Sequence, residues 1–181
     1  TPETLNACVA ANVTEMCEAL RAQSEILAGL EADGTIVITG ASSGFGAAAV
    51  RAFADRGDRV AICDREPAAV AHASETLPAG SITRQADVTD AAAAPGLFDE
   101  LVSELGGLDL FIYAAGVMPD VGPEEYDSEK DLAMVDVNLG GCITWTNLAA
   151  RLFHTQRSGT IVGIGSIAGD RGRKGAPVYG A

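Results

Sequence analysis

The sequence predicts an α/β fold built on a doubly wound parallel sheet with helices on both faces. Two observations carry this prediction. Short apolar runs rich in valine and isoleucine alternate with longer amphipathic segments over more than a hundred residues. A glycine-rich turn directly follows the first of these runs, at residues 40–46. Strands joined by helical crossovers lie parallel in one sheet, and the crossovers are right-handed.

The expected strands begin about 35 residues into the chain. The first, residues 35–39 (TIVIT), is too short for a helix and suits a strand buried on both faces. Four comparable runs predict strands at 59–63, 81–86, 109–113 and 160–164. For a doubly wound sheet we expect the order 3-2-1-4-5. Because such sheets usually contain about six strands or more, we expect later strands to be absent from the printed sequence.

Helical periodicity fills the intervals between these strands. We expect helices at 46–56, 67–77, 91–105 and 129–157, the third with Asp90 as its N-cap. The last of these helices is long and begins beyond a loop at 119–123.

The first 33 residues also show helical spacing, through Leu5, Val9, Val13, Met16, Leu20 and Leu27. Asp33 and Gly34 then interrupt the pattern. We therefore expect two parts: an N-terminal helical extension over 1–34, and a dinucleotide-binding domain over 35–181 that is incomplete at its C-terminal end.

Composition excludes several functional classes. Twelve Lys and Arg against 25 Asp and Glu give a net charge of −13, which repels phosphate backbones, so we expect no nucleic-acid partner. No apolar stretch reaches the roughly 20 residues of a membrane helix. The four cysteines form no Cys-x-x-Cys pair and lie far from both histidines, so we expect no metal site. With no secretory leader visible, we expect a cytoplasmic protein.

The glycine-rich turn predicts a phosphate-binding loop. Gly40 permits a sharp turn from strand to helix, while Gly44 and Gly46 let the backbone approach a pyrophosphate at the helix N-terminus. A glycine triplet alone is a weak signal, but here a buried strand precedes it and a helix follows. The candidate cofactor-binding residues of this turn are Gly40, Ser42, Ser43, Gly44, Phe45 and Gly46.

Asp64 supplies the acidic partner that a dinucleotide site needs. It follows the second strand, 24 residues beyond Gly40, where a carboxylate can accept hydrogen bonds from ribose hydroxyls and repel a 2′-phosphate. The plainer interpretation is that Asp64 caps the helix that opens near Pro67. Arg65 next to it could hold a 2′-phosphate, which leaves NADP as an alternative cofactor. Because the glycine turn itself contains no basic residue, NAD is favoured.

Taken in order, the motifs resemble those of the short-chain dehydrogenase/reductase family, a family with a Rossmann fold. Residues 39–46 (TGASSGFG) are similar to the family's cofactor motif, whose glycine spacing differs from the usual Gly-x-Gly-x-x-Gly. The resemblance covers residues 35–181. Further matches are Asp87-Val88 after the third strand, Tyr113-Ala-Ala-Gly116 after the fourth, Asn138 in the long helix, Ser166 after the fifth strand, and Tyr179 thirteen residues later.

The resemblance assigns roles to these residues. It implies that Asp87 and Val88 contact the adenine, and that the cofactor also touches Ala114, Ala115 and Gly116. The family has Asn-Asn-Ala-Gly where this chain has Tyr113 and Ala114 in the first two positions. The amides that brace the central sheet are therefore missing, and we expect a change in local packing rather than in chemistry.

The implied catalytic residues are Asn138, Ser166 and Tyr179. A free tyrosine has a pKa of about 10, too high for a base at neutral pH unless a positive charge lies nearby. The family supplies a lysine four residues after the tyrosine, which would be position 183, beyond Ala181. We therefore expect the enzyme to continue past the printed sequence and the 181 residues alone to be inactive. Ser166 would hydrogen-bond the substrate oxygen, and Asn138 would hold a water or a backbone bend that feeds a proton relay.

The predicted function is an NAD(P)-dependent oxidoreductase that transfers a hydride between a nicotinamide cofactor and a small secondary alcohol or ketone. The resemblance also implies a homo-oligomer, a dimer or tetramer. The alternative is a non-catalytic dinucleotide-binding module, or a fragment that lacks the activating lysine. Each catalytic candidate also has a plain interpretation: Ser166 as a hydroxyl at a strand end, Asn138 as a polar contact in a helix, and Tyr179 as a surface aromatic.

Overall fold

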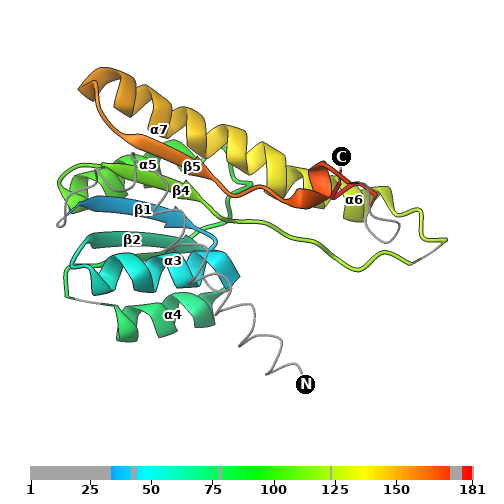
Figure 1. Ribbon diagram of the computed structural model, residues 1–181, viewed down its shortest axis with the longest axis horizontal. Helices are drawn as coiled ribbons and strands as arrows, with labels where there is room; N and C mark the ends of the chain where they lie inside the picture. Colours follow the sequence, from blue (N-terminus) through cyan, green and yellow to red (C-terminus); the bar gives the residue numbers. More distant parts are fainter. Residues whose placement is uncertain (1–33, 42–43, 78, 123, 172–176, 181) are drawn as a thin grey trace.

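The computed structural model describes residues 34–41, 44–77, 79–122, 124–171 and 177–180. They form one five-stranded sheet in the order β3-β2-β1-β4-β5, and every pair of neighbouring strands is parallel (Figure 1). The predicted fold class and strand order are confirmed. The helix expected in the first 33 residues, from Leu5 to Leu27, lies outside the described residues.

The strands lie close to their predicted positions. They are β1 Thr35–Thr39, β2 Arg59–Asp64, β3 Ile82–Gln85, β4 Leu110–Tyr113 and β5 Thr160–Gly163. All five residues of β1 are buried, because β1 lies at the centre of the sheet and helices cover both of its faces.

Helices α3 (Gly44–Asp55) and α4 (Pro67–Thr76) cover one face of the sheet, and α5 (Ala94–Leu105) and α7 (Cys142–Gln156) cover the other (Figure 1). Alternate side chains of β1 point to opposite faces of the sheet. Ile36 and Ile38 join the core beneath α3, while Val37 joins the core beneath α5 and α7.

Three aromatic rings fill the core between the sheet, α5 and α7. Phe111 of β4 stacks on Trp145 of α7 with ring planes only 4° apart, and Phe98 of α5 meets both rings edge-on. Trp145 and Phe111 are fully buried, so this cluster fixes how α7 lies on β4.

Two acidic side chains hold the start of β1 at the edge of the sheet where the strands begin. The Asp58 carboxylate accepts a hydrogen bond from the Gly34 N–H at 3.0 Å and pairs with Arg56 at 2.6 Å. Asp109 accepts from both the backbone N–H and the hydroxyl of Thr35, each at 2.8 Å.

No helix in the described part of the chain combines the length and the apolar character that crossing a bilayer requires.

The prediction that a helix runs from 91 to 105 is wrong at its start. Helix α5 begins at Ala94, and residues 91–93 form a turn. The Asp90 carboxylate caps this turn by accepting from the N–H groups of Ala92 and Ala93, and the Asp90 carbonyl accepts from Ala94. Pro95 then occupies the first turn of the helix, where its missing N–H costs nothing.

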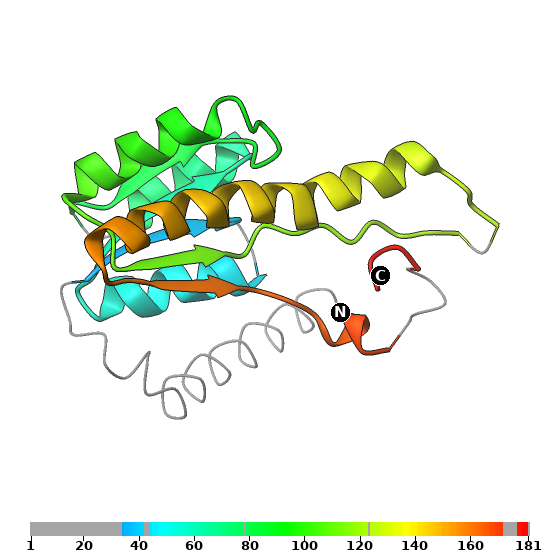
Figure 2. The same cartoon turned by 90° about the horizontal axis from the view of Figure 1, so that it is seen from above.

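The single helix predicted over 129–157 is also wrong in its middle. Helix α6 (Ser128–Val135) and helix α7 are separated by a π-helical turn at Asp136–Gly141, although the three segments form one continuous rod (Figure 2). Asn138 lies within this turn. Single π turns inside α-helices occur frequently at functional sites.

Candidate cofactor site

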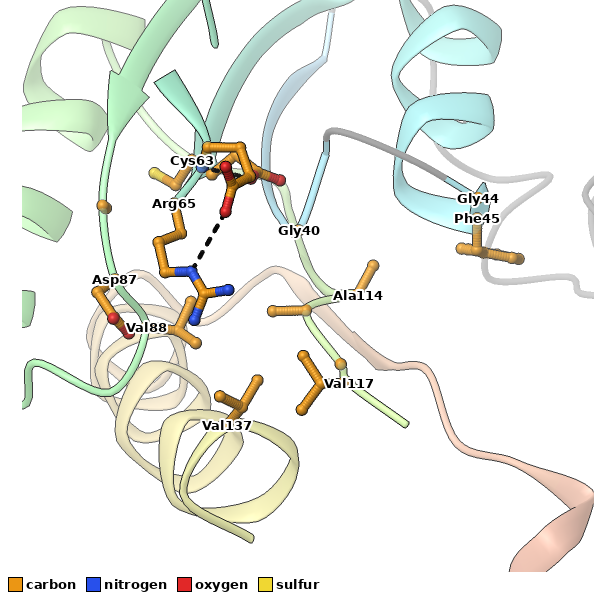
Figure 3. A pocket seen from close by; sticks show the side chains of 15 residues that line it. Gly40, Gly44, Phe45, Cys63, Arg65, Asp87, Val88, Ala114, Val117 and Val137 are labelled. Carbon is orange, nitrogen blue, oxygen red and sulfur yellow. Dashed lines mark hydrogen bonds and ion pairs between the residues drawn. The ribbon is translucent and has the colours of Figure 1, made fainter. Parts of the chain in front are cut away.

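A pocket of about 380 Å³ opens at the carboxyl ends of the central strands (Figure 3). The chain leaves β1 toward β2 on one side, whereas β4 and β5 lie on the other side of β1. The strand order therefore reverses between β1 and β4, and ligands of open α/β sheets bind in the crevice at such a point.

Most of the predicted cofactor-binding residues line this pocket. They are Gly40, Gly44, Phe45, Asp64, Arg65, Asp87, Val88, Ala114, Ala115 and Gly116. Gly46 is buried beneath the loop instead of lining the pocket. Ser42 and Ser43 lie outside the described residues.

Close backbone contacts explain two of the glycines. Gly40 has φ +69°, and a Cβ atom there would lie 2.4 Å from the Cα of Ala115. A Cβ atom at Gly46 would lie 2.1 Å from the carbonyl oxygen of Gly40. Neither position can hold a side chain unless backbone moves. Gly44 differs, because its φ of +52° favours glycine while the space beside it is open.

The plainer interpretation of Asp64 as the cap of the helix near Pro67 is wrong, because the N-cap of α4 is Glu66, whose side chain makes no capping hydrogen bond. Asp64 lies at the lip of the pocket. Its Oδ1 accepts a hydrogen bond from the Glu66 N–H at 3.0 Å, and the residue is only 7% exposed. It thus caps the turn that leads into α4. The pocket also includes Asp64 in its lining, so the capping contact and a ligand-facing position coexist in one residue.

Arg65 points across the pocket toward Asp87 and Val88 (Figure 3). Its Nε lies 3.6 Å from a carboxylate oxygen of Glu66, and both side chains are mostly exposed. The pKa of Asp87 is lowered, first by the Thr89 hydroxyl, then by the Thr89 N–H and further by the charge of Arg65. Two carboxylates therefore share the field of this one guanidinium.

The other wall of the pocket is built where the chain leaves β4 and passes the π turn. Val117 and Val137 line it. Asn138 joins the two segments: its Oδ1 accepts from the Val117 N–H at 2.8 Å, and its Nδ2 donates to the Val117 carbonyl at 2.9 Å. Both hydrogen bonds fix the backbone of Val117, and the proton-relay role of Asn138 stays a prediction.

The structure does not assemble the three catalytic candidates through contacts between their side chains. Ser166 is exposed, and its hydroxyl accepts from the Ala168 N–H at 3.2 Å as the cap of a short 3₁₀ turn, Ile167–Gly169. Tyr179 is half-buried in the turn at 177–180, which both views place near that 3₁₀ turn (Figures 1 and 2). The described hydrogen bonds of Asn138 and Ser166 go to backbone and not to each other.

The sequence prediction missed five residues that line the pocket: Cys63, Glu66, Ala86, Val117 and Val137. Each is a direct neighbour of a predicted residue, so widening every motif by one position would have found them. Burial raises the pKa of the Cys63 thiol to about 12, so this residue serves as a small apolar wall and not as a nucleophile.

The sheet order, the helices on both faces and the pocket at the strand reversal define a Rossmann-type α/β protein. The short chain dehydrogenase family matches residues 34–181, which is most of the chain. The chain therefore belongs to the short chain dehydrogenase family.

Individual relatives agree with this assignment. The chain is 37% identical over 146 residues to an L-fucose dehydrogenase of Mus musculus, covering 80% of this chain and 52% of the relative. It is 33% identical to a carbonyl reductase family member 4 of Xenopus tropicalis, covering 80% of this chain and 61% of the relative. The chain thus spans about half the length of the first of these relatives and three fifths of the second.

Solved structures show the same fold. An NAD⁺-bound xylitol dehydrogenase superposes with a TM-score of 0.76 at 26% identity, covering 83% of this chain and 59% of the other. A serine dehydrogenase from Escherichia coli superposes with a TM-score of 0.75 at 26% identity, covering 81% of this chain and 68% of the other.

Proposed function

We propose that this chain is the cofactor-binding part of an NAD-dependent oxidoreductase that transfers a hydride between a nicotinamide and a secondary alcohol or ketone. One observation carries the proposal: the pocket at the strand reversal is bounded by a glycine turn that opens a helix, with Asp64 at its lip. This combination suits a dinucleotide with its pyrophosphate at the helix N-terminus.

The described residues fit such a cofactor. Gly44 stands at the start of α3 with open space beside it, so a phosphate group can approach the backbone there. Asp64 would accept hydrogen bonds from the ribose hydroxyls, while Asp87 and Val88 would contact the adenine. Ala114, Ala115 and Gly116 would line the path toward the nicotinamide. When bound, the cofactor supplies the hydride-accepting or hydride-donating ring.

We propose NAD over NADP on electrostatic grounds. Asp64 places a carboxylate where a 2′-phosphate would lie, and its low exposure limits solvent screening. Arg65 is the cation that could offset this, but it lies beside Glu66 and within the field of Asp87. The two carboxylates leave it a poor partner for a further anion.

Tyr179 is proposed as the group that gives or takes the hydroxyl proton of the substrate. Its pKa must fall toward neutrality for this, which requires a nearby positive charge. Ser166 would donate its O–H to the substrate oxygen and share the charge that develops there. Asn138 would act on backbone, by fixing Val117 at the pocket wall.

The decisive experiment is a cofactor-linked absorbance assay on the intact protein with a panel of alcohols and ketones. Sugars and polyols come first, because the relatives include proteins named for L-fucose and xylitol. Tyr179→Phe should abolish turnover and leave the Kd for NADH unchanged, while Tyr126→Phe, at a tyrosine 92% exposed, should change neither. Turnover retained in Tyr179→Phe would refute the role of Tyr179. NADH binding without turnover on any substrate would favour a non-catalytic binding module.

We further propose that the protein forms homo-oligomers, dimers or tetramers, through the rod of α6, the π turn and α7. Four large apolar side chains are exposed at roughly helical spacing along it: Leu132, Val135, Leu139 and Ile143. Such a contiguous apolar stripe is typical of a contact surface. A cytoplasmic location is part of the same proposal, and the two described cysteines, Cys63 and Cys142, are both free thiols.

A further inference from the structure

Tyr113 links the central sheet to the π turn. It is the last residue of β4, is 2% exposed, and its hydroxyl donates to the carbonyl oxygen of Val137 at 2.5 Å. Val137 lies inside the π turn and precedes Asn138. Burial raises the pKa of the Tyr113 phenol, so the group remains a protonated donor around neutral pH.

Gly141 makes room for this phenol. A Cβ atom at Gly141 would lie 2.4 Å from the Tyr113 hydroxyl and 3.1 Å from Val88. The φ of Gly141 is not in the left-handed region, so backbone conformation is not what demands a glycine there. A glycine is required there because a side chain would clash with the Tyr113 hydroxyl and crowd Val88.

Hydrogen bonds connect the end of β4 and the segment after it to the π turn from both sides. Tyr113 reaches from the sheet to the Val137 carbonyl, and Asn138 reaches back to both polar backbone groups of Val117. We call these four residues, Tyr113, Val117, Val137 and Asn138, the clasp. Its two valines line the pocket, so the clasp sets the position of one pocket wall.

We infer that Tyr113 is a positioning residue of the enzyme, which acts through Asn138 to hold the wall formed by Val117 and Val137. It makes this brace with a phenol where the family pattern has an asparagine, and Gly141 is its necessary partner. The inference rests on the proposed function for its kinetic part, whereas its structural part can be measured without turnover.

The first test is hydrogen exchange at the Val117 amide in the intact protein. Tyr113→Phe removes one hydroxyl and leaves the Val137 carbonyl without that donor, which loosens the π turn that carries Asn138. The Val117 amide should exchange about tenfold faster, while Tyr126→Phe should leave it unchanged. An unchanged exchange rate in Tyr113→Phe would overturn the inference. Gly141→Ala disturbs the same contact from the other side and should give the same acceleration, which guards against a folding defect peculiar to one variant.

The second test asks whether Tyr113 acts through Asn138. Tyr113→Phe should lower kcat about tenfold with little change in the Kd for NADH, and Asn138→Ala should lower it at least as much. In the Asn138→Ala background, Tyr113→Phe should cause no further loss. Equal factors in both backgrounds, or full activity in Tyr113→Phe, would overturn the inference. If the wild-type protein turns over no substrate, the proposed function fails, and the exchange experiment still decides the clasp.

Discussion

Asp64→Asn is the sharpest test of the cofactor preference, because it separates two roles that the structure combines in one side chain. The carboxylate caps the Glu66 N–H through Oδ1 at 3.0 Å and also lines the pocket. An asparagine keeps an oxygen at the capping position. It removes the negative charge, and its NH₂ group cannot accept a hydrogen bond from a ribose hydroxyl.

The expected magnitude follows from the burial of Asp64, which is 7% exposed. Hydrogen bonds to a charged acceptor contribute about 1.5–3 kcal/mol, so losing them should weaken NADH binding by about tenfold to 150-fold. In the wild type, the Asp64 carboxylate and a 2′-phosphate about 5 Å away would repel each other by about 3 kcal/mol. Asp64→Asn removes this repulsion, so NADPH should bind more tightly. The preference for NADH over NADPH should therefore fall at least about tenfold.

The assay is fluorescence titration of NADH and NADPH, with thermal unfolding measured in parallel. Asp64→Asn should leave the midpoint of thermal unfolding nearly unchanged. Asp64→Ala also loses the hydrogen bond from the Glu66 N–H, which should cost about 1 kcal/mol, or about 2–4 °C. Asp55→Asn, at an exposed carboxylate at the far end of α3, is the control for a change of net charge. An unchanged ratio of the two dissociation constants in Asp64→Asn would refute the assignment.

Three further predictions concern the loop, the pH dependence and the oligomer. Gly46→Ala places a Cβ 2.1 Å from the Gly40 carbonyl, so urea unfolding should show a loss of about 1–3 kcal/mol together with weaker NADH binding, while Gly96→Ala, with open space in α5, should not destabilise. The pKa of Asp87 lies below its ordinary value of 3.8 in the folded protein, so its stabilising effect is present above that pH and is lost as the pH falls through the folded value. The difference in unfolding free energy between wild type and Asp87→Asn should then shrink between pH 5 and pH 3, and a constant difference would contradict this. Leu139→Glu, at a leucine 56% exposed, should reduce the oligomer mass in sedimentation, and an unchanged mass would exclude this surface as the contact.

The strand positions and their order could be predicted from the sequence because each strand is a local apolar run. Residues such as Ile36 and Val37 are buried whichever face of the sheet they point to, so each strand reads as a continuous apolar run that is easy to recognise. The start of α5 could not be predicted, since the run of alanines at 91–94 favours a helix, yet residues 91–93 form a turn. Asp90 caps the turn, and Pro95 then sets where the helix begins.

The glycine turn could be predicted because its pattern is local, and the contact that requires Gly46 lies within the loop itself. The contact that requires Gly40 is with Ala115, beyond β4, and is not visible in the local sequence. The π turn could not be predicted. Its contacts are long-range: the Tyr113 hydroxyl donates to the Val137 carbonyl, 24 residues away, and Gly141 leaves space for the phenol. The pair of glycines at 140 and 141 inside a helical pattern was the one local signal of a break.

The two walls of the pocket are therefore held by different kinds of contact, and this difference has a functional consequence. The wall formed by the glycine turn and Asp64 is held by backbone, through the close approach of Gly40 to Ala115 and the hydrogen bond from the Glu66 N–H to Asp64, beside the proposed phosphate and ribose positions. The opposite wall depends on side chains, Tyr113 and Asn138, that bridge distant segments. Changes to the first wall should alter cofactor affinity with little effect on kcat at saturating cofactor. Changes to the second should lower kcat while affinity is retained, because that wall leads to the proposed reacting end of the pocket.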